Sequence, residues 1–243
     1  MTTIKKNVTV FNSDVEANQG YKYTTNTKFS SVVSNLRLTN ITLESIPAGV
    51  KSLIDIGCGD GTYTYELYKA RTDLTIAATD PATKAVELAK QNYSNIDFFP
   101  SNILVPESFA NRHYDMAVIR GVLHHLSDPK KAIENTLDLV NYMLIIEPNG
   151  NNPVLKYIEK HSAYHVEHEE QSFTTSQLKN WCGDAGWQIS SIQYVGFVPF
   201  FFPTFLSKMI YFFQPFMEKI PMLRFYLSGQ IVILCQKNKN GKR

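Results

Sequence analysis

A glycine-rich loop after an apolar run carries the clearest chemical signal in the chain. In LIDIGCGDGTYT, residues 53–64, glycines stand at positions 57, 59 and 61. Glycine lets the backbone approach a ligand closely and adopt dihedral angles that other residues avoid. The spacing departs from the G-x-G-x-x-G dinucleotide fingerprint, because Thr62 stands where the third glycine belongs. Asp55 and Asp60 would repel a pyrophosphate, so the loop predicts a cationic nucleoside ligand without phosphate.

An acidic residue ends the next apolar run. Asp80 closes LTIAATD, 19 residues after Gly61. A carboxylate at this place accepts hydrogen bonds from both hydroxyls of a ribose. The alternative is that Asp80 caps a helix that begins near Pro81. Because the loop and the acid occur together at a suitable separation, we predict that Asp80 binds a ribose.

Two adjacent histidines, His124 and His125, follow a further apolar run, YDMAVIRG. The pKa of imidazole lies near neutral pH, so either side chain can take a proton from a substrate. The alternative is that one histidine packs and caps the next helix, or that neither is catalytic. We predict a catalytic role within this pair.

These residues need a scaffold, and apolar runs alternate with helical patterns along the chain. Such strands indicate a parallel sheet covered on both faces, which predicts an α/β doubly wound fold. A first helix is expected from about Ser34 through Ile46, and Pro81 suits the first turn of a later one. Strands are expected in VKSLIDIG, LTIAATD, IDFFP, YDMAVIRG, YMLIIEP, WQISSIQYVG and GQIVILCQK. Helices are expected in TYTYELYKAR, PATKAVELAKQN, KKAIENTLDLV and TTSQLKNWCGDAG, and burial is expected for Leu36, Leu38, Ile41, Leu43 and Ile46.

Three segments resemble the motifs of class I S-adenosylmethionine-dependent methyltransferases. They are LIDIGCGDGTYT, AATDP and YDMAVIRGVLHHLSDPKKAI, within roughly residues 50–147. HHLSDP resembles the bacterial small-molecule group of types 11 and 12, including methyltransferases of surface-glycan and lipid-linked pathways. The resemblance implies a Rossmann-like, mostly parallel seven-stranded sheet with an antiparallel last strand. It also implies S-adenosylmethionine as the cofactor.

The resemblance assigns the cofactor contacts position by position. The glycine loop with Asp55 would hold the methionine part, and Arg120 with Gly121 would line the same end. Asn102 stands where the family usually has an acidic residue for the adenine amino group. The full cofactor set is Asp55, Gly57, Cys58, Gly59, Gly61, Asp80, Pro81, Asn102, Ile103, Arg120 and Gly121.

The acceptor is expected to be a small molecule, a sugar or a lipid-linked compound, and O-methylation is the favoured chemistry. Motifs of the Asn/Asp-Pro-Pro-Tyr type are absent from the sequence, which argues against a nucleic-acid substrate. Two rival hypotheses are an NAD-dependent oxidoreductase and a non-catalytic protein that binds S-adenosylmethionine. The predicted acceptor contacts are Tyr21, Tyr23, Arg37, Glu147, Asn149, Asn152, His165 and His168.

Three histidines, His161, His165 and His168, would share one face of a helix at their spacing. Together with Glu169 they could hold a metal, but a polar wall of the acceptor pocket or a solvated face is the preferred interpretation. We therefore predict no metal site.

An aromatic insertion, residues 196–228, separates the last two predicted strands. Pro203 before Thr204 predicts a helix start, and Phe205, Met209 and Phe212 would fall on one side with Phe213 and Phe216. The insertion is expected to cap the site, to form an apolar pocket or dimer surface, or to touch a membrane through 196–216. The predicted division is a cap segment, 1–50, and a domain, 51–243, with a further acceptor-side insertion, 148–173.

Composition and charge limit the possible ligands and compartments of the protein. The chain has 243 residues and a net charge of +2, without a basic stripe for nucleic acid. Its three cysteines are far apart, which fits a reducing cytoplasm. The N-terminus lacks the pattern of a secretory signal, and the apolar stretch 194–216 is broken by prolines and a lysine. We expect a cytoplasmic protein with peripheral contact at the inner membrane face.

Overall fold

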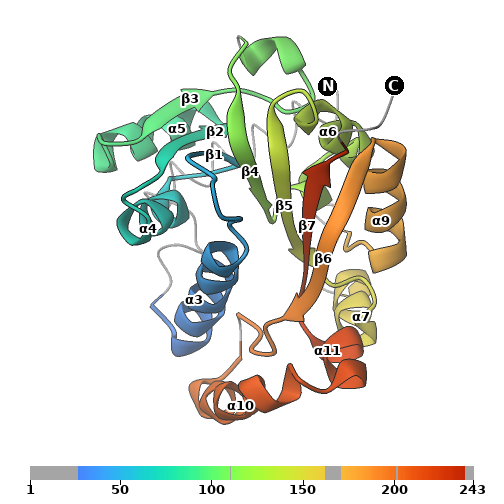
Figure 1. Cartoon of the computed structure of the whole chain (residues 1–243). Coiled ribbons are helices and arrows are strands. Elements are labelled where there is room, and N and C mark those ends of the chain that lie inside the picture. Colours follow the sequence, from blue (N-terminus) through green and yellow to red (C-terminus); the bar gives the residue numbers. More distant parts are fainter. Residues whose placement is uncertain (1–26, 110, 162–170, 201, 239–243) are drawn as a thin grey trace.

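A seven-stranded sheet forms the centre of the computed structural model, which describes residues 27–109, 111–161, 171–200 and 202–238. The strand order is β3-β2-β1-β4-β5-β7-β6, and β7 runs antiparallel to both of its neighbours (Figure 1). The predicted doubly wound sheet with an antiparallel last strand is therefore confirmed. The strands are β1 (Ser52–Ile56), β2 (Thr75–Asp80), β3 (Asp97–Pro100), β4 (Tyr114–Arg120), β5 (Val140–Pro148), β6 (Trp187–Val195) and β7 (Gln230–Lys237).

Helices cover both faces of the sheet. Successive side chains of a strand point to opposite faces, and Leu53 and Ile54 of β1 are both fully buried, each in a different apolar cluster. One cluster includes residues of α6 and α9, and the other includes residues of α3, α4 and α5. The helices are α3 (Phe29–Glu44), α4 (Thr62–Ala70), α5 (Thr83–Asn92), α6 (Pro129–Thr136), α7 (Pro153–His161), α9 (Thr175–Asp184), α10 (Thr204–Met217) and α11 (Pro221–Leu227), with short 3-10 turns η1 (Pro106–Phe109) and η2 (Leu123–His125).

The first helix differs from its prediction. It begins at Phe29, so Ser34 lies inside the helix and does not cap it. The Ser34 hydroxyl instead donates to the carbonyl oxygen of Val198 at 2.6 Å, and Ser30 donates to that of Phe200 at 2.7 Å. Leu36, expected to be buried, is 48% exposed. Polar contacts with the segment after β6 therefore decide which face of α3 is buried.

Pro81 also lies outside the helix that it was predicted to start. Helix α5 begins at Thr83, with Ala82 as its N-cap residue. The Asp80 carboxylate accepts a hydrogen bond from the Ala82 amide at 2.8 Å, which closes a tight turn before the helix. Pro81 belongs to this turn.

The aromatic insertion leaves the sheet at its carboxyl edge. Helix α10 begins at Thr204 after Pro203, as predicted. Val195, the last residue of β6, pairs with Gln230, which in turn pairs with Pro148 at the end of β5. Helices α10 and α11 consequently lie beyond the end of β5 and β6 in Figure 1. Within the described ranges, no helix is both long and apolar enough to span a membrane.

Candidate active site

The glycine loop between β1 and α4 has the backbone geometry that its sequence predicts. Gly57, Gly59 and Gly61 have φ angles of 83°, 56° and 79°, in the left-handed region that favours glycine. A Cβ atom on Gly57 would overlap the Val122 side chain, and one on Gly61 would lie 2.8 Å from Cζ of Phe98. Glycine is thus required both for the loop conformation and for the close packing beneath it.

Asp80 ties this loop to the end of β2. Its Oδ2 accepts a hydrogen bond from the Gly59 amide at 3.0 Å, and its Oδ1 accepts the one from Ala82. Burial raises the pKa of Asp80 to about 6, although these two amide donors lower it. Each carboxylate oxygen has further acceptor capacity. Asp80 can therefore hold the loop and still accept a hydrogen bond from a ligand hydroxyl.

A buried acid, Asp55, and a half-buried cation, Arg120, lie near the ends of β1 and β4. Asp55 accepts a hydrogen bond from the Thr64 hydroxyl at 2.5 Å, and burial raises the pKa of its carboxyl group. The Arg120 guanidinium lies 4.1 Å from the centre of the Tyr63 ring and donates to Asn35 at 3.0 Å. Burial lowers the pKa of Arg120, whereas Tyr63 and Asp55 raise it. Sequence reasoning missed Asn35, Tyr63 and Thr64, because their approach depends on how α3 and α4 pack.

Four other predicted cofactor residues lie in the glycine loop and in the loops after β3 and β4. Cys58 is buried in the glycine loop, and burial raises the pKa of its thiol. Gly121 follows β4 with a φ angle of 66°. Asn102 accepts a hydrogen bond from the Leu104 amide at 2.9 Å, and the Ile103 side chain is buried. The adenine contact of Asn102 and the cofactor contact of Ile103 remain predictions.

His124 is held by a buried carboxylate. Its Nδ1 lies 2.7 Å from Oε2 of Glu147, which is fully buried near the end of β5. The other oxygen of Glu147 accepts hydrogen bonds from the amides of Val122 and Leu123, at 2.8 and 2.7 Å. The rings of His124 and His125 lie 3.9 Å apart between centres. Because a carboxylate only accepts, Nδ1 carries the proton and Nε2 is the basic nitrogen of His124.

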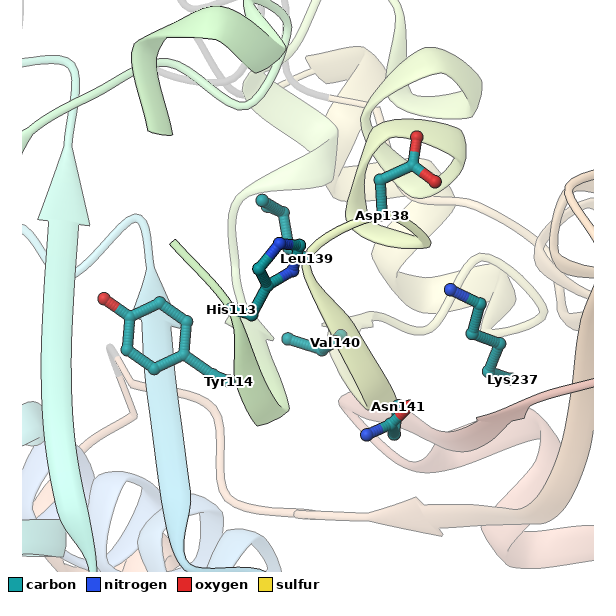
Figure 2. Close-up of a pocket in the computed structure, with 7 residues that line it drawn as sticks. All are labelled: His113, Tyr114, Asp138, Leu139, Val140, Asn141 and Lys237. Atoms are coloured by element: carbon teal, nitrogen blue, oxygen red, sulfur yellow. The ribbon is translucent and has the colours of Figure 1, made fainter. Parts of the chain in front are cut away.

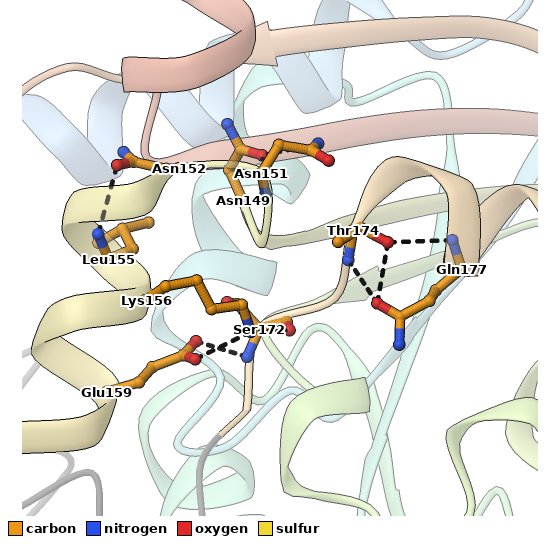
Figure 3. A network of polar contacts seen from close by, with 9 residues as sticks. All are labelled: Asn149, Asn151, Asn152, Leu155, Lys156, Glu159, Ser172, Thr174 and Gln177. Atoms are coloured by element: carbon orange, nitrogen blue, oxygen red, sulfur yellow. Dashed lines mark hydrogen bonds and ion pairs between the residues drawn. The ribbon is translucent and has the colours of Figure 1, made fainter.

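The asparagine-rich segment after β5 bonds to the aromatic insertion. The Asn149 side chain donates to the carbonyl oxygen of Phe225 at 2.9 Å and to the hydroxyl of Ser228 at 3.0 Å. Asn152 donates to the Ser228 carbonyl oxygen at 3.1 Å, and both asparagine side chains are buried. Figure 3 shows these asparagines at the start of α7. The structure therefore places them against the end of α11.

Lys156 and Glu159 hold the chain where it returns to the sheet. Lys156 of α7 donates to the Ser172 carbonyl oxygen at 2.7 Å, and the Ser172 amide donates to Glu159 at 2.6 Å (Figure 3). Thr174 and Gln177 then form a reciprocal cap at the start of α9. These contacts fix the two ends of the segment between α7 and α9.

The other predicted acceptor contacts are scattered. Arg37 forms a two-pronged ion pair with Glu218 after α10, at 2.9 and 3.1 Å, so it joins α3 to the insertion. Tyr21, Tyr23, His165 and His168 lie outside the described residues. No cluster of metal-ligating side chains occurs within the residues that the structure describes.

A surface pocket lies away from these groups. Its residues come from the starts of β4 and β5 (Figure 2). The glycine loop follows the other end of β1, which runs parallel to β4, so the pocket lies at the opposite edge of the sheet. Because open parallel sheets bind ligands at the carboxyl ends of their strands, this pocket is not the candidate site. Its lining is His113, Tyr114, Asp138, Leu139, Val140, Asn141 and Lys237.

Comparisons with known proteins identify the family of the chain. The profile of a family described as "Methyltransferase domain" matches residues 34–192. Malonyl-(acyl-carrier protein) O-methyltransferase of Halalkalibacterium halodurans is 32% identical over 88 residues, which cover 34% of this chain and 32% of that protein. The match thus spans about a third of that relative's length.

Two solved structures resemble most of the fold. Magnesium protoporphyrin IX methyltransferase from Synechocystis PCC 6803, solved with bound SAH, gives a TM-score of 0.55 at 16% identity, covering 86% of this chain and 83% of that one. A SAM-dependent methyltransferase from Archaeoglobus fulgidus gives a TM-score of 0.58 at 16% identity, covering 86% and 94%. At this identity the likeness concerns the fold.

Proposed function

The chain belongs to the methyltransferase-domain family, and on that premise we propose that it methylates a hydroxyl group of a small acceptor with S-adenosylmethionine. The acceptor class comprises small molecules, sugars and lipid-linked compounds. The observation that carries the proposal is the contact between His124 and Glu147 at the carboxyl edge of the sheet. A hydroxyl loses its proton on methylation, so a base beside it assists the reaction.

The charges and the loop geometry of the cofactor region support the choice of S-adenosylmethionine. Gly57 and Gly59 are half-buried after β1, and Asp80 offers carboxylate oxygens at the end of β2. Asp55 supplies negative charge for an ammonium group, and Arg120 supplies positive charge for a carboxylate. When bound, the cofactor supplies an electrophilic methyl group on its sulfonium. The family assignment and this charge pattern favour it over a nicotinamide dinucleotide.

His124 is the base in this proposal. Nε2 accepts the proton of the acceptor hydroxyl, while Glu147 holds the Nδ1–H and stabilises the imidazolium that results. The two backbone amides that bond to Glu147 keep its carboxylate fixed. Glu147 therefore orients the base, and direct contact with the acceptor is left to other residues.

The first experiment identifies the acceptor. Methyl-labelled S-adenosylmethionine is incubated with the protein and fractions of a cell extract, and the labelled product is analysed by mass spectrometry. We expect an O-methyl product. Labelling at nitrogen, carbon or sulfur would overturn the O-methylation proposal, and no turnover in any fraction would favour a non-catalytic binding protein.

The second experiment tests the base. In Glu147→Gln the side-chain oxygen can still accept from the two amides, but the new amide group donates to Nδ1 of His124. The imidazole proton then moves to Nε2, which can no longer accept. We expect kcat to fall by about 10²-fold or more, with unchanged affinity for S-adenosylhomocysteine.

Two further variants make this test decisive. His124→Gln should lose a similar factor, and the double variant should lose little more, because both residues act in one step. Full activity in Glu147→Gln, or in both His124→Gln and His125→Gln, would remove the proposed base. Unfolding curves for each variant control for loss of structure.

A further inference from the structure

Helix α10 buries its polar side and exposes its aromatic side. Its two buried residues are Ser207 and Gln214. Phe205 and Phe212 are 78% and 77% exposed, and Phe216 is 65% exposed. Their spacing places them on one side of the helix. A helix of a soluble domain normally turns its apolar stripe toward the core, so this orientation is reversed.

We call the most exposed apolar residues of α10 and α11 the aromatic surface. It includes Met222, which is 72% exposed on α11, the helix that follows α10 directly. Figure 1 shows both helices at one end of the molecule. An apolar patch of this kind marks a contact surface. The aromatic surface consists of Phe205, Met209, Phe212, Phe213, Phe216 and Met222.

Specific contacts hold α10 in this orientation. Gln214 accepts a hydrogen bond from the Phe197 amide at 3.1 Å, and Glu218 pairs with Arg37. The Gly196 amide also donates to Glu218, at 3.2 Å. Rotating the helix to bury Phe212 would break these contacts. The outward direction of the aromatic surface is therefore built into the fold.

The charges around the aromatic surface indicate its partner. Residues 204–227 contain three cations, Lys208, Lys219 and Arg224, and all three are exposed. The single acid in this range, Glu218, is paired with Arg37. Two copies meeting through this surface would bring like charges together, whereas anionic lipid headgroups complement them.

We propose that α10 and α11 dock the protein on an anionic lipid bilayer, with the aromatic surface inserted among the headgroups. Helix α10 has 14 residues and is about 21 Å long, so it lies in the interface instead of crossing it. The proposal stands independently of the proposed methyl transfer. Because the insertion joins the sheet beside Pro148, docking brings the candidate site to the membrane and gives it access to a lipid-linked acceptor.

Vesicle flotation tests the proposal with the full chain. Vesicles of phosphatidylcholine, with and without phosphatidylglycerol, are mixed with the protein and floated through a density gradient. We expect the protein to float with anionic vesicles and to float less at high salt. Phe212→Ser/Phe216→Ser should lower the partition coefficient at least about tenfold. Lys208→Gln/Lys219→Gln should lower it about tenfold on anionic vesicles, with little change on neutral ones.

Val105→Ser is the matched control. Val105 is 46% exposed and follows β3, the edge strand opposite to β6, so this variant should float like the unaltered protein. Unchanged unfolding temperature and S-adenosylhomocysteine affinity would show that the phenylalanine variant is folded. These readouts also separate failure of docking from failure of the proposed function.

Three outcomes would overturn the proposal. The first is an unaltered protein that stays out of the floated anionic fraction, and the second is a phenylalanine variant that floats as well as the unaltered protein. The third is a dimer in sedimentation that the phenylalanine variant abolishes, without vesicle binding by either protein. That result would assign the aromatic surface to a second copy of the chain.

Discussion

The affinity of the protein for its cofactor should depend on the ionisation of Asp80. Burial raises its pKa to about 6, and at the predicted ribose contact only the ionised carboxylate could accept hydrogen bonds from both hydroxyls. At pH 5 about a tenth of the unliganded protein is then ionised, compared with nearly all of it at pH 8. The apparent Kd equals the intrinsic Kd divided by this fraction, so it should be about tenfold higher at pH 5.

The same shift determines how Asp80 affects stability. The folded-state pKa lies above the ordinary value of 3.8, so the folded protein binds this proton more tightly than the unfolded chain does. The contribution of Asp80 to stability is therefore fully present below pH 4 and is lost as the pH rises through about 6. The difference is about 3 kcal/mol across that window. At neutral pH the ionised Asp80 thus destabilises the ligand-free protein, and the same ionised form is the one that should bind the cofactor.

Titration calorimetry with S-adenosylhomocysteine between pH 5 and pH 8 measures the effect, since this ligand has no group that titrates in that range. Asp80→Asn is the control, because it keeps the shape of the side chain and removes the ionisation. We expect weaker binding by about one or two orders of magnitude at pH 8, together with a flat pH profile. Equal affinity of the unaltered protein at both ends of the range would refute the reasoning. An equally steep profile in Asp80→Asn would assign the ionisation to another group.

Two further predictions concern the same edge of the sheet. Gly57→Ala should destabilise the protein by more than Gly49→Ala in urea unfolding, because both positions have a positive φ but only Gly57 faces a side chain, Val122. The positive φ alone costs about 1–2 kcal/mol at either position. Equal destabilisation of the two variants would therefore show that the Val122 side chain moves aside without loss of stability. Arg120→Gln should weaken binding of S-adenosylhomocysteine about tenfold or more, while 5′-methylthioadenosine, which lacks the amino-acid part, should bind unchanged. Equal weakening for both ligands would place Arg120 away from that part.

Local patterns were sufficient for the sheet and for the glycine loop. Apolar runs separated by helical patterns predicted β1 to β7. Such runs arise because a parallel sheet buries both faces of a strand, as it does at Leu53 and Ile54. The start of α10 after Pro203 was also predictable, since proline fixes the backbone before a first turn. These features depend on neighbouring residues, so the sequence contains their signal directly.

Contacts between distant segments were not predictable in this way. Ser34 looked like a helix cap, but its hydroxyl bonds to a carbonyl 164 residues away. Arg37 was predicted to contact the acceptor, and its carboxylate partner lies 181 residues away in the insertion. The pairing of His124 with Glu147 likewise depends on β4 and β5 being adjacent in the sheet. Residue type identified these side chains as candidates for capping, binding or catalysis. The partner of each one depends on which segments the fold brings together.

Three of the predicted acceptor contacts therefore gain a shared structural role. Arg37 bonds to Glu218 between α10 and α11, and Asn149 and Asn152 bond to Ser228 after α11, so the insertion is held in its middle and at its last residue. The two asparagines directly follow β5, which carries Glu147, whereas Arg37 belongs to α3. Loosening these bonds should disturb the orientation of the aromatic surface and the position of the base together. Membrane docking and acceptor selection would then be set by one rigid unit, in which the polar edge of the sheet determines where the aromatic helices point.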